Sequence, residues 1–279
     1  MAVLNARIES LAYYPVKGCR RIECAALELV PSGVRGDREW MIVGPDDQFV
    51  TQRTDAILAT IAPVTDDRAL TLSAPGHPPL QVPLSYRGER RTVRIWKDTC
   101  AADDMGDAAA AWLTAVGGRP LRLVRFATDG VRHADKTWAR DDFAPVKFTD
   151  AYPVLVTQSA SLGALNAALG RASEGPLPMN RFRPNIVLGG LAAWDEDRIE
   201  HLRIGGVLLR LAKPSTRCIV TTTNQDSGAR GVEPLPTLKR LRWHRGLKGV
   251  TFGVNATVLQ PGTVRVGDVV EIAWRESAA

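Results

Sequence analysis

The sequence predicts a mainly β protein of the α+β class, on three observations. The first hundred residues contain many short apolar or alternating stretches separated by Gly, Pro or Asp clusters, a pattern typical of antiparallel β structure. Helical patterns are confined to residues 103–116, 158–170 and 234–245. With 279 residues, 45% of them hydrophobic, the chain can bury the core of one large domain or two modest ones.

In the N-terminal half, the expected strands are residues 3–14, 25–30, 40–43, 69–73 and 92–96. Asp103 to Val116 predicts a helix with acidic residues in its first turn and Gly117-Gly118 at its end, so that Asp104 and Asp107 act as cap and dipole partners. The next expected strand, residues 121–126, marks the predicted boundary between a first domain, 1–120, and a second, 121–279.

The second half combines a long loop, a strand and a helix. Residues 128–145 are polar and without periodicity, which favours a loop. Residues 152–157 predict a strand, and the following residues to Gly170 an amphipathic helix capped by Ser159 and Ser161. Backbone N–H groups at such a helix start also suit a phosphate. The tail, residues 261–272, predicts a hairpin around Gly267-Asp268.

The segment around Cys218 is the most informative part of the chain. An apolar run, 207–212, stops at Pro214, which has no backbone donor and is expected to end regular pairing. A short turn then leads to Cys218, and the β-branched run 219–223 predicts a strand closed by Asn224, Asp226 and Gly228. Neighbouring Arg217 favours the thiolate, the form that ligates soft metals. The alternative is a buried, inert thiol.

Composition excludes several classes of protein. Cysteines at positions 19, 24, 100 and 218 form no CxxC pair, so disulfides and a structural zinc are not expected. No stretch has the ~20 apolar residues of a membrane helix, and the N-terminus has no secretory pattern, which together predict a cytoplasmic protein without a membrane partner. The net charge of +6 comes from scattered arginines, which favours a positive pocket for a phosphorylated cofactor over nucleic acid.

Three further segments carry candidate binding residues. Tyr14-Pro-Val-Lys17-Gly18-Cys19 is a strand end leading into a turn, where Lys17 is either a ligand or a solvated lysine. Gly33 to Trp40 includes Asp37 and Arg38, which as a surface ion pair would contribute little. In Asn180 to Leu188, Pro184 favours an extended Arg183, so that Arg181 is expected to share its face.

Together these motifs resemble the MOSC-domain family, and most closely the branch of the mitochondrial amidoxime-reducing component and its bacterial relatives. Ser215-Thr-Arg-Cys-Ile-Val-Thr-Thr222, with Asp226-Ser-Gly228, is similar to the family's molybdenum-binding cysteine segment. Phe182-Arg-Pro-Asn-Ile186 and the Phe252 to Ala256 turn also match the family's motifs. The resemblance implies an N-terminal β-rich domain followed by a MOSC β-barrel decorated with helices, with the cofactor in the cleft between them.

The resemblance also implies roles for individual residues. Cys218 would be the catalytic residue and the thiolate ligand of a molybdenum–molybdopterin cofactor. The residues expected to hold that cofactor are Lys17, Arg38, Ser159, Arg183, Thr216, Arg217 and Asn255, with Arg35 as the competitor of Arg38. Where the family often has serine, this chain has Gly18, so only a backbone amide is available there.

The implied activity is the two-electron reduction of N-hydroxylated or N-oxygenated compounds such as hydroxylamines and amidoximes. The four-cysteine iron–sulfur domain that some bacterial relatives carry at the C-terminus is not found here, so electrons are expected from a separate ferredoxin, flavin or haem protein. Neither an iron–sulfur cluster nor pyridoxal phosphate is expected in this chain. The alternative function is a molybdenum-cofactor-binding or sulfur-carrier module that uses a Cys218 persulfide.

Overall fold

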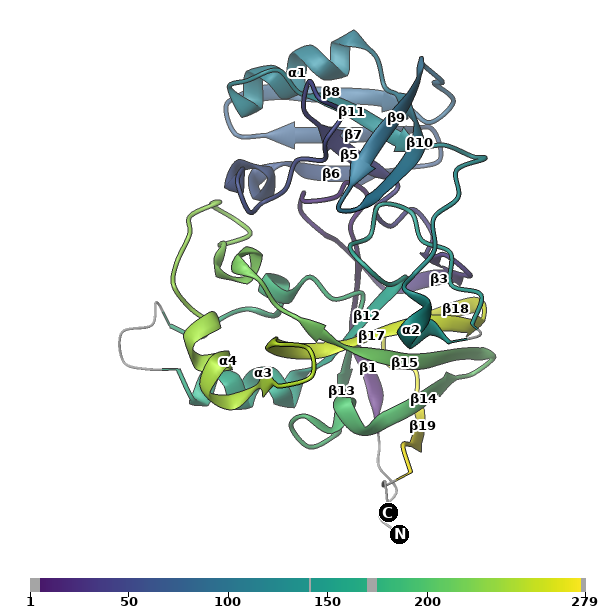
Figure 1. Ribbon diagram of the computed structural model, residues 1–279, viewed down its shortest axis with the longest axis vertical. Helices are drawn as coiled ribbons and strands as arrows, with labels where there is room; N and C mark the ends of the chain where they lie inside the picture. The colour runs from purple at the N-terminus through teal and green to yellow at the C-terminus, as the bar shows by residue number, and fades with distance from the viewer. Residues whose placement is uncertain (1–5, 141, 170–174, 277–279) are drawn as a thin grey trace.

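The computed structural model describes residues 6–140, 142–169 and 175–276. Within this part of the chain, strands predominate and four α-helices accompany them, which confirms the predicted α+β class. The molecule has two lobes (Figure 1). We call residues 40–126, at the top of that view, the upper lobe, and residues 6–34 with 148–276 the lower lobe. No helix in the described ranges has the length and apolar character needed to cross a membrane.

The upper lobe contains two antiparallel sheets and one long helix. Its four-stranded sheet has the order β5 (Trp40–Val43), β11 (Arg122–Phe126), β10 (Asp98–Asp104) and β9 (Arg90–Ile95). The second sheet has the order β6 (Ala62–Thr65), β7 (Ala69–Ala74) and β8 (His77–Pro83). Helix α1 (Asp107–Gly117) buries Trp112 and Leu113 in the core of this lobe, and a 3-10 turn, η1 (Ala56–Thr60), adds Leu58.

The lower lobe is organised around one large sheet. Its hydrogen-bonded order is β19 (Glu271–Trp274), β14 (Ile199–Ile204), β15 (Val207–Thr216), β17 (Gly249–Gln260), β12 (Val154–Gln158), β13 (Ile186–Gly189), β1 (Arg7–Tyr13) and β2 (Ile22–Cys24), with β16 (Trp243–His244) paired to β17. Of its pairings, that between β12 and β13 is parallel. A small sheet of β18 (Gly262–Arg265), β3 (Ala26–Val30) and β4 (Gly33–Val34) lies beside it.

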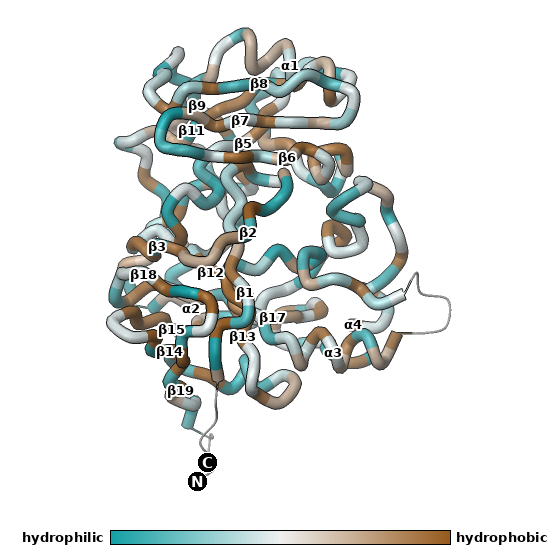
Figure 2. Tube along the Cα trace, turned by 180° about the vertical axis from the view of Figure 1, so that it is seen from behind, coloured by the Kyte–Doolittle hydropathy of each residue, from teal (hydrophilic) through white to brown (hydrophobic). Residues whose placement is uncertain are grey.

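Helices and 3-10 turns of the lower lobe lie next to this sheet, together with the helix Lys136–Ala139, which belongs to the segment that connects the lobes. They are α2 (Lys136–Ala139), α3 (Ser159–Ala167), η2 (Met179–Phe182), η3 (Asp195–Arg198), η4 (Ile219–Thr222) and α4 (Leu235–Leu241). Figure 2 shows hydrophobic segments along the strands of both lobes and hydrophilic segments at many of the turns. The buried side chains of the large sheet form one apolar cluster that includes Ile8, Val156, Leu211 and Val254.

Most strands predicted from alternation and turn residues are present. The predicted strand 40–43 is confirmed as β5, and 69–73, 92–96 and 121–126 correspond to β7, β9 and β11. The predicted domain boundary at residue 120 falls just before β11, whose sheet partners are β5 and β10 in the upper lobe. The division into two domains and the closure of a β-barrel stay predictions.

The segment after Cys218 is a 3-10 turn, so the predicted strand over 219–223 is wrong. The hydroxyl groups of Thr221 and Thr222 donate to the carbonyl oxygens of Cys218 and Ile219, three residues back. Such bonds compete with strand pairing and close a tight turn. Pro214, expected to end regular pairing, instead lies inside β15 opposite Val254, where the register shifts and so accommodates its missing N–H.

Helix starts also differ from the predictions. Asp104 lies in β10, where its carboxylate pairs with Arg91 and Arg122, and α1 begins at Asp107 without a side-chain cap. Helix α3 likewise has no side-chain cap, because the hydroxyl of Ser161 donates to Glu196 at 2.7 Å instead. In both cases a charged partner from another element takes the side chain that the local pattern assigned to the helix.

Two segments predicted as turns belong to strands. Phe252 to Ala256 lies inside β17, where Gly253 has a φ of 71° and its backbone packs against β12 so closely that a Cβ would lie 2.7 Å from the carbonyl oxygen of Val156. The tail does not form a hairpin. Its two strands, β18 and β19, pair with β3 and β14, and Val264 of β18 is buried in the core of the lower lobe.

Candidate functional site

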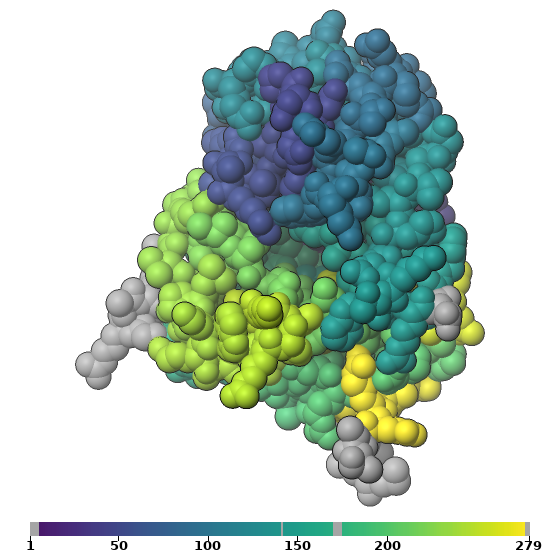
Figure 3. All heavy atoms as spheres, in the orientation of Figure 1, coloured from purple at the N-terminus to yellow at the C-terminus, as the bar shows by residue number. Residues whose placement is uncertain are grey.

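A cavity of about 620 Å³ lies between the two lobes. The space-filling view shows the hollow where the blue upper lobe meets the green and teal lower lobe (Figure 3). Residues 17–18, 51–53 and Trp96 form one side, and residues 149–152, 181–185 and 213–221 form much of the other. Its volume lies in the ordinary range of small-molecule and cofactor sites.

The lining of this cavity is strongly cationic. Asp150 is the one carboxylate among its described lining residues, against eight side chains that carry positive charge: Lys17, Arg38, Arg53, Arg181, Arg183, Lys213, Arg217 and Lys248. Low-dielectric walls concentrate the field of such a cluster. The cavity is therefore suited to an anionic ligand, such as one carrying phosphate.

Cys218 lies where β15 ends and η4 begins, and it lines the cavity with a half-buried side chain. Its position is fixed by backbone contacts on both sides. The amide of Arg217 donates to the carbonyl oxygen of Val250 at 2.8 Å, and the carbonyl oxygen of Cys218 accepts from Thr221 N and Oγ1. A thiol held on an ordered turn and open to a cationic cavity is placed to ligate a metal or to attack an electrophile.

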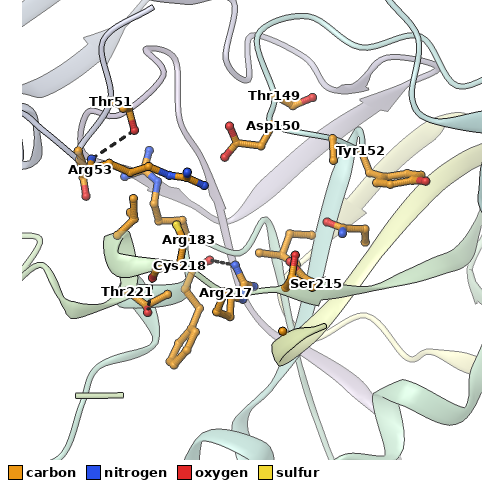
Figure 4. A pocket seen from close by; sticks show the side chains of 18 of the residues that line it. Thr51, Arg53, Thr149, Asp150, Tyr152, Arg183, Ser215, Arg217, Cys218 and Thr221 are labelled. Carbon is orange, nitrogen blue, oxygen red and sulfur yellow. Dashed lines mark hydrogen bonds between the residues drawn. The ribbon is translucent and has the colours of Figure 1, made fainter. Parts of the chain in front are cut away.

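The guanidinium of Arg217, next to Cys218, is held by two backbone carbonyl oxygens. Its Nε donates to the carbonyl oxygen of Phe252 at 2.9 Å and its Nη1 to that of Phe182 at 3.2 Å. Figure 4 shows Arg217 next to Cys218 in the wall of the cavity. Arg217 Nη2 is buried and has no hydrogen-bond partner among the described residues. Burial lowers the pKa of Arg217 to about 10, against the favourable charge of Cys218, so the guanidinium stays charged at neutral pH. Because the N–H of Nη2 lies in a cationic cavity and has no acceptor, it is a donor that a bound anion can use.

Tyr14 supports two further arginines of the cavity. The guanidinium carbons of Arg38 and Arg183 lie 4.1 and 4.2 Å from the centre of its ring. The ring is buried, and its hydroxyl donates to the carbonyl oxygen of Pro184 at 3.2 Å. Arg38 is also paired with Asp37 at 2.5 Å, and the other oxygen of Asp37 accepts from the amide of Tyr14. These contacts make the two guanidinium groups one rigid unit.

Arg183 has a backbone conformation that the sequence did not predict. Its φ of 57° and ψ of 47° are left-handed, so the extended conformation expected before Pro184 is wrong. In this conformation Nη1 donates to the carbonyl oxygen of Cys19 at 2.7 Å and to Gln225 Oε1 at 3.1 Å. Burial lowers the pKa of Arg183 to about 10. A residue held in a left-handed backbone conformation by contacts from two distant segments of the chain is typical of a functional site.

Lys17 and Asp150 meet at the rim of the same cavity. Lys17 Nζ donates to the carbonyl oxygen of Phe148 at 2.9 Å and to Asp150 Oδ1 at 2.6 Å. Burial lowers the pKa of Lys17, while Asp150 opposes that change. For Asp150, desolvation raises the pKa, but the charge and hydrogen bond of Lys17 outweigh it and bring the pKa below its usual value. An ammonium group has three donors, so one N–H of Lys17 remains for a ligand.

Seven of the eight candidate site residues line this one cavity: Lys17, Arg38, Arg183, Thr216, Arg217, Cys218 and Asn255. Ser159, at the start of α3, is not among the lining residues. Arg181 lines the cavity and donates to the carbonyl oxygen of Thr222 at 2.6 Å. Arg35, the competitor of Arg38, is exposed and pairs with Glu28, outside the cavity.

The residues of the site that were not predicted include Tyr14, Trp96 and Asp150, besides the cavity cations Arg53, Lys213 and Lys248. Tyr14 stands three residues before Lys17 in the motif that singled out the lysine, but nothing local indicates that its ring supports two arginines. Trp96 lies between β9 and β10, far from any candidate motif. Asp150 is a lone acid in the loop before β12. Its importance comes from the cations that the fold places around it.

Comparison with known protein families supports the resemblance found in the motifs. Residues 5–120 match the MOSC N-terminal beta barrel domain, and residues 144–271 match the MOSC domain. The chain belongs to the MOSC-domain family. Among curated proteins, this MOSC chain is 33% identical to mitochondrial amidoxime-reducing component 1 of Homo sapiens. The alignment of 281 residues covers 94% of this chain and 82% of the human protein. The MOSC chain is 32% identical to the Xenopus laevis protein of the same name, over 94% of this chain and 81% of the relative.

Two more distant similarities complete the comparison. Molybdenum cofactor sulfurase of Bos taurus is 29% identical to the MOSC chain over 266 residues, which is 88% of this chain but 30% of the sulfurase. The crystal structure of the YUAD protein from Bacillus subtilis covers 97% of both chains, with a TM-score of 0.43 and 10% identity. That structural similarity is too low to inform the site.

Proposed function

We propose that this protein binds a molybdenum–molybdopterin cofactor in the cavity between the lobes and reduces N-hydroxylated compounds. The observation that carries the proposal is the half-buried Cys218 thiol in a cavity where eight cations face one carboxylate. A soft thiolate suits molybdenum, and guanidinium forks suit the phosphate of the pterin. The names of the relatives, amidoxime-reducing components, support the same activity.

The residues present fit such a cofactor. Cys218 would be its protein ligand. Arg38 and Arg183, fixed on Tyr14, and Arg217, with its unpartnered buried Nη2, would hold the phosphate and the pterin. Lys17 would use its third N–H, and Thr216 and Asn255 line the same wall. Ser159 stays a predicted ligand, although it is not among the lining residues. When bound, the cofactor would supply the two-electron redox centre, and the protein supplies binding, orientation and charge.

The proposed reaction consumes two electrons and two protons for each N–O bond. The N–O bond of R₂N–OH breaks, one proton ends on the nitrogen to give R₂NH, and the other joins the hydroxyl oxygen, which leaves as water. The electrons would come from a separate ferredoxin, flavin or haem protein. Arg240 and Arg245, on and after α4, are exposed and suit an acidic carrier. Arg242, also considered for that surface, is half-buried and paired with Asp197. Cytoplasmic location stays a prediction, because the amidoxime-reducing relatives are named mitochondrial.

The decisive experiment gives cofactor-loaded protein an artificial low-potential electron donor and a hydroxylamine or amidoxime. We expect the amine or amidine to form, and a purified electron carrier to replace the artificial donor with a rate that falls as salt rises. Loaded protein that reduces no N–O substrate would contradict the proposal.

The likeness to molybdenum cofactor sulfurase favours one second candidate, a module that carries cofactor or sulfur on Cys218. Transfer of cofactor or persulfide sulfur from this protein to an apo-enzyme, in the absence of reductase activity, would support that alternative.

A further inference from the structure

A second cavity, of about 520 Å³, lies beside the loop that follows β11. Among the described residues, its lining shares none with the cavity around Cys218. One wall consists of residues 130–133, 143 and 145–147 of the loop, and the rest consists of residues 32, 39, 87, 103 and 125–128. Its volume lies in the range of small-molecule sites. We call this space the second cavity, and it is a separate place for a ligand.

The loop wall of the second cavity is a short two-stranded ribbon. The amide of Val146 donates to the carbonyl oxygen of Arg132, and that of Ala134 to the carbonyl oxygen of Ala144, both at 2.9 Å. In extended chains, every second side chain points to the same face. Ala134 and Ala144 are on the buried face. The residues of the opposite face all line the second cavity, and they are Val131, His133, Phe143, Pro145 and Lys147.

This face of the ribbon is largely apolar and open to solvent. Val131 is 72% exposed and Phe143 is 68% exposed, and the Phe143 ring contacts the ring of His133 edge-on with 5.8 Å between their centres. Gly130 lets the loop approach the opposite wall, because a Cβ there would lie 2.7 Å from the ring of Phe126. Single exposed apolar side chains are ordinary, but large ones gathered in one cavity mark a binding site.

Three cations of the second cavity are joined through one carboxylate and one carbonyl oxygen. Glu39 accepts from Arg125 Nε at 2.7 Å and from Lys147 Nζ at 2.6 Å. The carbonyl oxygen of Leu84 accepts from Arg125 Nη1 at 2.6 Å and from Arg87 Nη1 at 2.7 Å. Positive charge therefore exceeds negative charge in this cluster. The other charged lining residues are paired outside the cavity, Arg132 with Asp98 and Asp103 with Arg90.

Two of the three cations keep hydrogen-bond donors for a ligand. Lys147 has three N–H groups and uses one on Glu39. Arg87 is exposed, and within the described part of the chain no hydrogen bond uses its Nε or Nη2. Arg125, which lies between them in the chain of contacts, is committed to Glu39 and Leu84.

We propose that the second cavity binds a small carboxylic acid with an apolar body. The body would lie against Val131 and Phe143, and the carboxylate would accept from Lys147 and Arg87 in charge-assisted hydrogen bonds. A carboxylate offers two oxygens to these two donors and carries a single charge. A phosphate monoester would bring a second negative charge next to Glu39 and is therefore disfavoured. The proposal does not depend on the reductase function, because the two cavities have no described lining residue in common.

Calorimetric titration of octanoate tests the proposal, with cofactor-loaded protein so that the cavity around Cys218 is filled. We expect octanoate to bind to a single site. Acetate lacks the apolar body, octylammonium reverses the charge, and octyl phosphate adds a charge, so each should bind at least about tenfold more weakly. Octylammonium or octyl phosphate binding as tightly as octanoate would overturn the proposal.

Two pairs of variants test the apolar wall and the cations in turn. Val131→Asn should weaken octanoate binding at least about fivefold. Its matched control is Val232→Asn, because Val232 is 75% exposed and lies outside the second cavity. Arg87→Gln should weaken binding about tenfold, and Arg35→Gln, which removes an exposed arginine outside the cavity, should not.

A further variant and two other outcomes complete the test. Lys147→Gln leaves Glu39 paired with Arg125 and should also weaken binding about tenfold. Circular dichroism and thermal unfolding establish that every variant is folded. Octanoate binding that is equal in wild type and in the three cavity variants would refute the site, as would binding only to protein that lacks the cofactor. Light scattering that shows a dimer, dissociated by Val131→Asn, would also refute it, because a second copy of the chain would then cover the cavity.

Discussion

Tyr14 is expected to hold the cofactor site together without touching the reacting atoms, and two substitutions separate its contributions. Tyr14→Phe keeps the ring under Arg38 and Arg183 and removes only the hydroxyl that donates to Pro184. Tyr14→Leu also removes the ring. If the ring is the support, Tyr14→Leu must lose cofactor that Tyr14→Phe retains, while both variants remain folded.

The magnitudes follow from the contacts. Loss of the buried hydroxyl bond should lower the free energy of unfolding by about 1 kcal/mol, and loss of the ring by about 2–4 kcal/mol. Each guanidinium contact with the ring contributes on the order of 1 kcal/mol. Losing both therefore corresponds to roughly thirtyfold weaker cofactor binding in Tyr14→Leu, whereas Tyr14→Phe should retain cofactor nearly as wild type does.

The assay pairs urea unfolding with the molybdenum and pterin content of protein purified from a host that makes the cofactor. Folded Tyr14→Leu that retains wild-type cofactor content would refute the reasoning. So would Tyr14→Phe losing as much cofactor as Tyr14→Leu, because the hydroxyl, and not the ring, would then be the support.

Three further predictions concern Cys218, Arg183 and Glu196. Cys218→Ser should keep the fold, by circular dichroism, but lose the roughly one molybdenum per chain expected of wild type; full reductase activity in this variant would exclude Cys218 as the ligand. Arg183→Ala should release cofactor, since it removes a charge-assisted contact of about 1.5–3 kcal/mol, and Arg35→Ala, which removes an exposed arginine outside the cavity, should not. Burial raises the pKa of Glu196 to about 7, against its hydrogen bond from Ser161. The folded state therefore binds this proton more tightly than the unfolded state, and stability from this group falls as pH rises from about 4.5 to 7. Glu196→Gln should remove that part of the pH dependence, about 1 kcal/mol per pH unit, in urea unfolding at pH 5, 6, 7 and 8; parallel wild-type and variant curves would contradict it.

Strands could be predicted where the local pattern of apolar residues matches the burial of the strand. Alternation in residues 69–73 and the apolar run of residues 40–43 gave β7 and β5 to within a residue. The failures come from side-chain bonds that compete with the predicted structure, some of them local and some between elements that are distant in the sequence. Thr221 and Thr222 bonded back to the chain and formed η4, and Asp104 paired with two arginines instead of capping α1.

The candidate site was predictable as a set of residues but not as a geometry. Motif resemblance selected seven residues that line one cavity, because the resemblance already reflects the fold of the family. It gave no indication that Arg183 adopts a left-handed backbone or that Tyr14 supports it. Ser159 is a residue that the local pattern selected but that does not line the cavity. A helix start suits a phosphate by local rules, yet the fold places this one away from the cavity lining.

The cavity exists only because distant segments meet, and this explains both its chemistry and its absence from local sequence patterns. Lys17 bonds Asp150 across 133 positions, Arg183 bonds Cys19 across 164, and Gln52 bonds Gln225 across 173. In each of these contacts, one partner lies in the upper lobe or in the segment 16–19 that packs against it. The other partner lies in the lower lobe. Charged groups that are held in this way cannot move apart to relieve their mutual repulsion. An anionic ligand relieves that repulsion directly, so binding between the lobes and the stability of their contact must be thermodynamically linked.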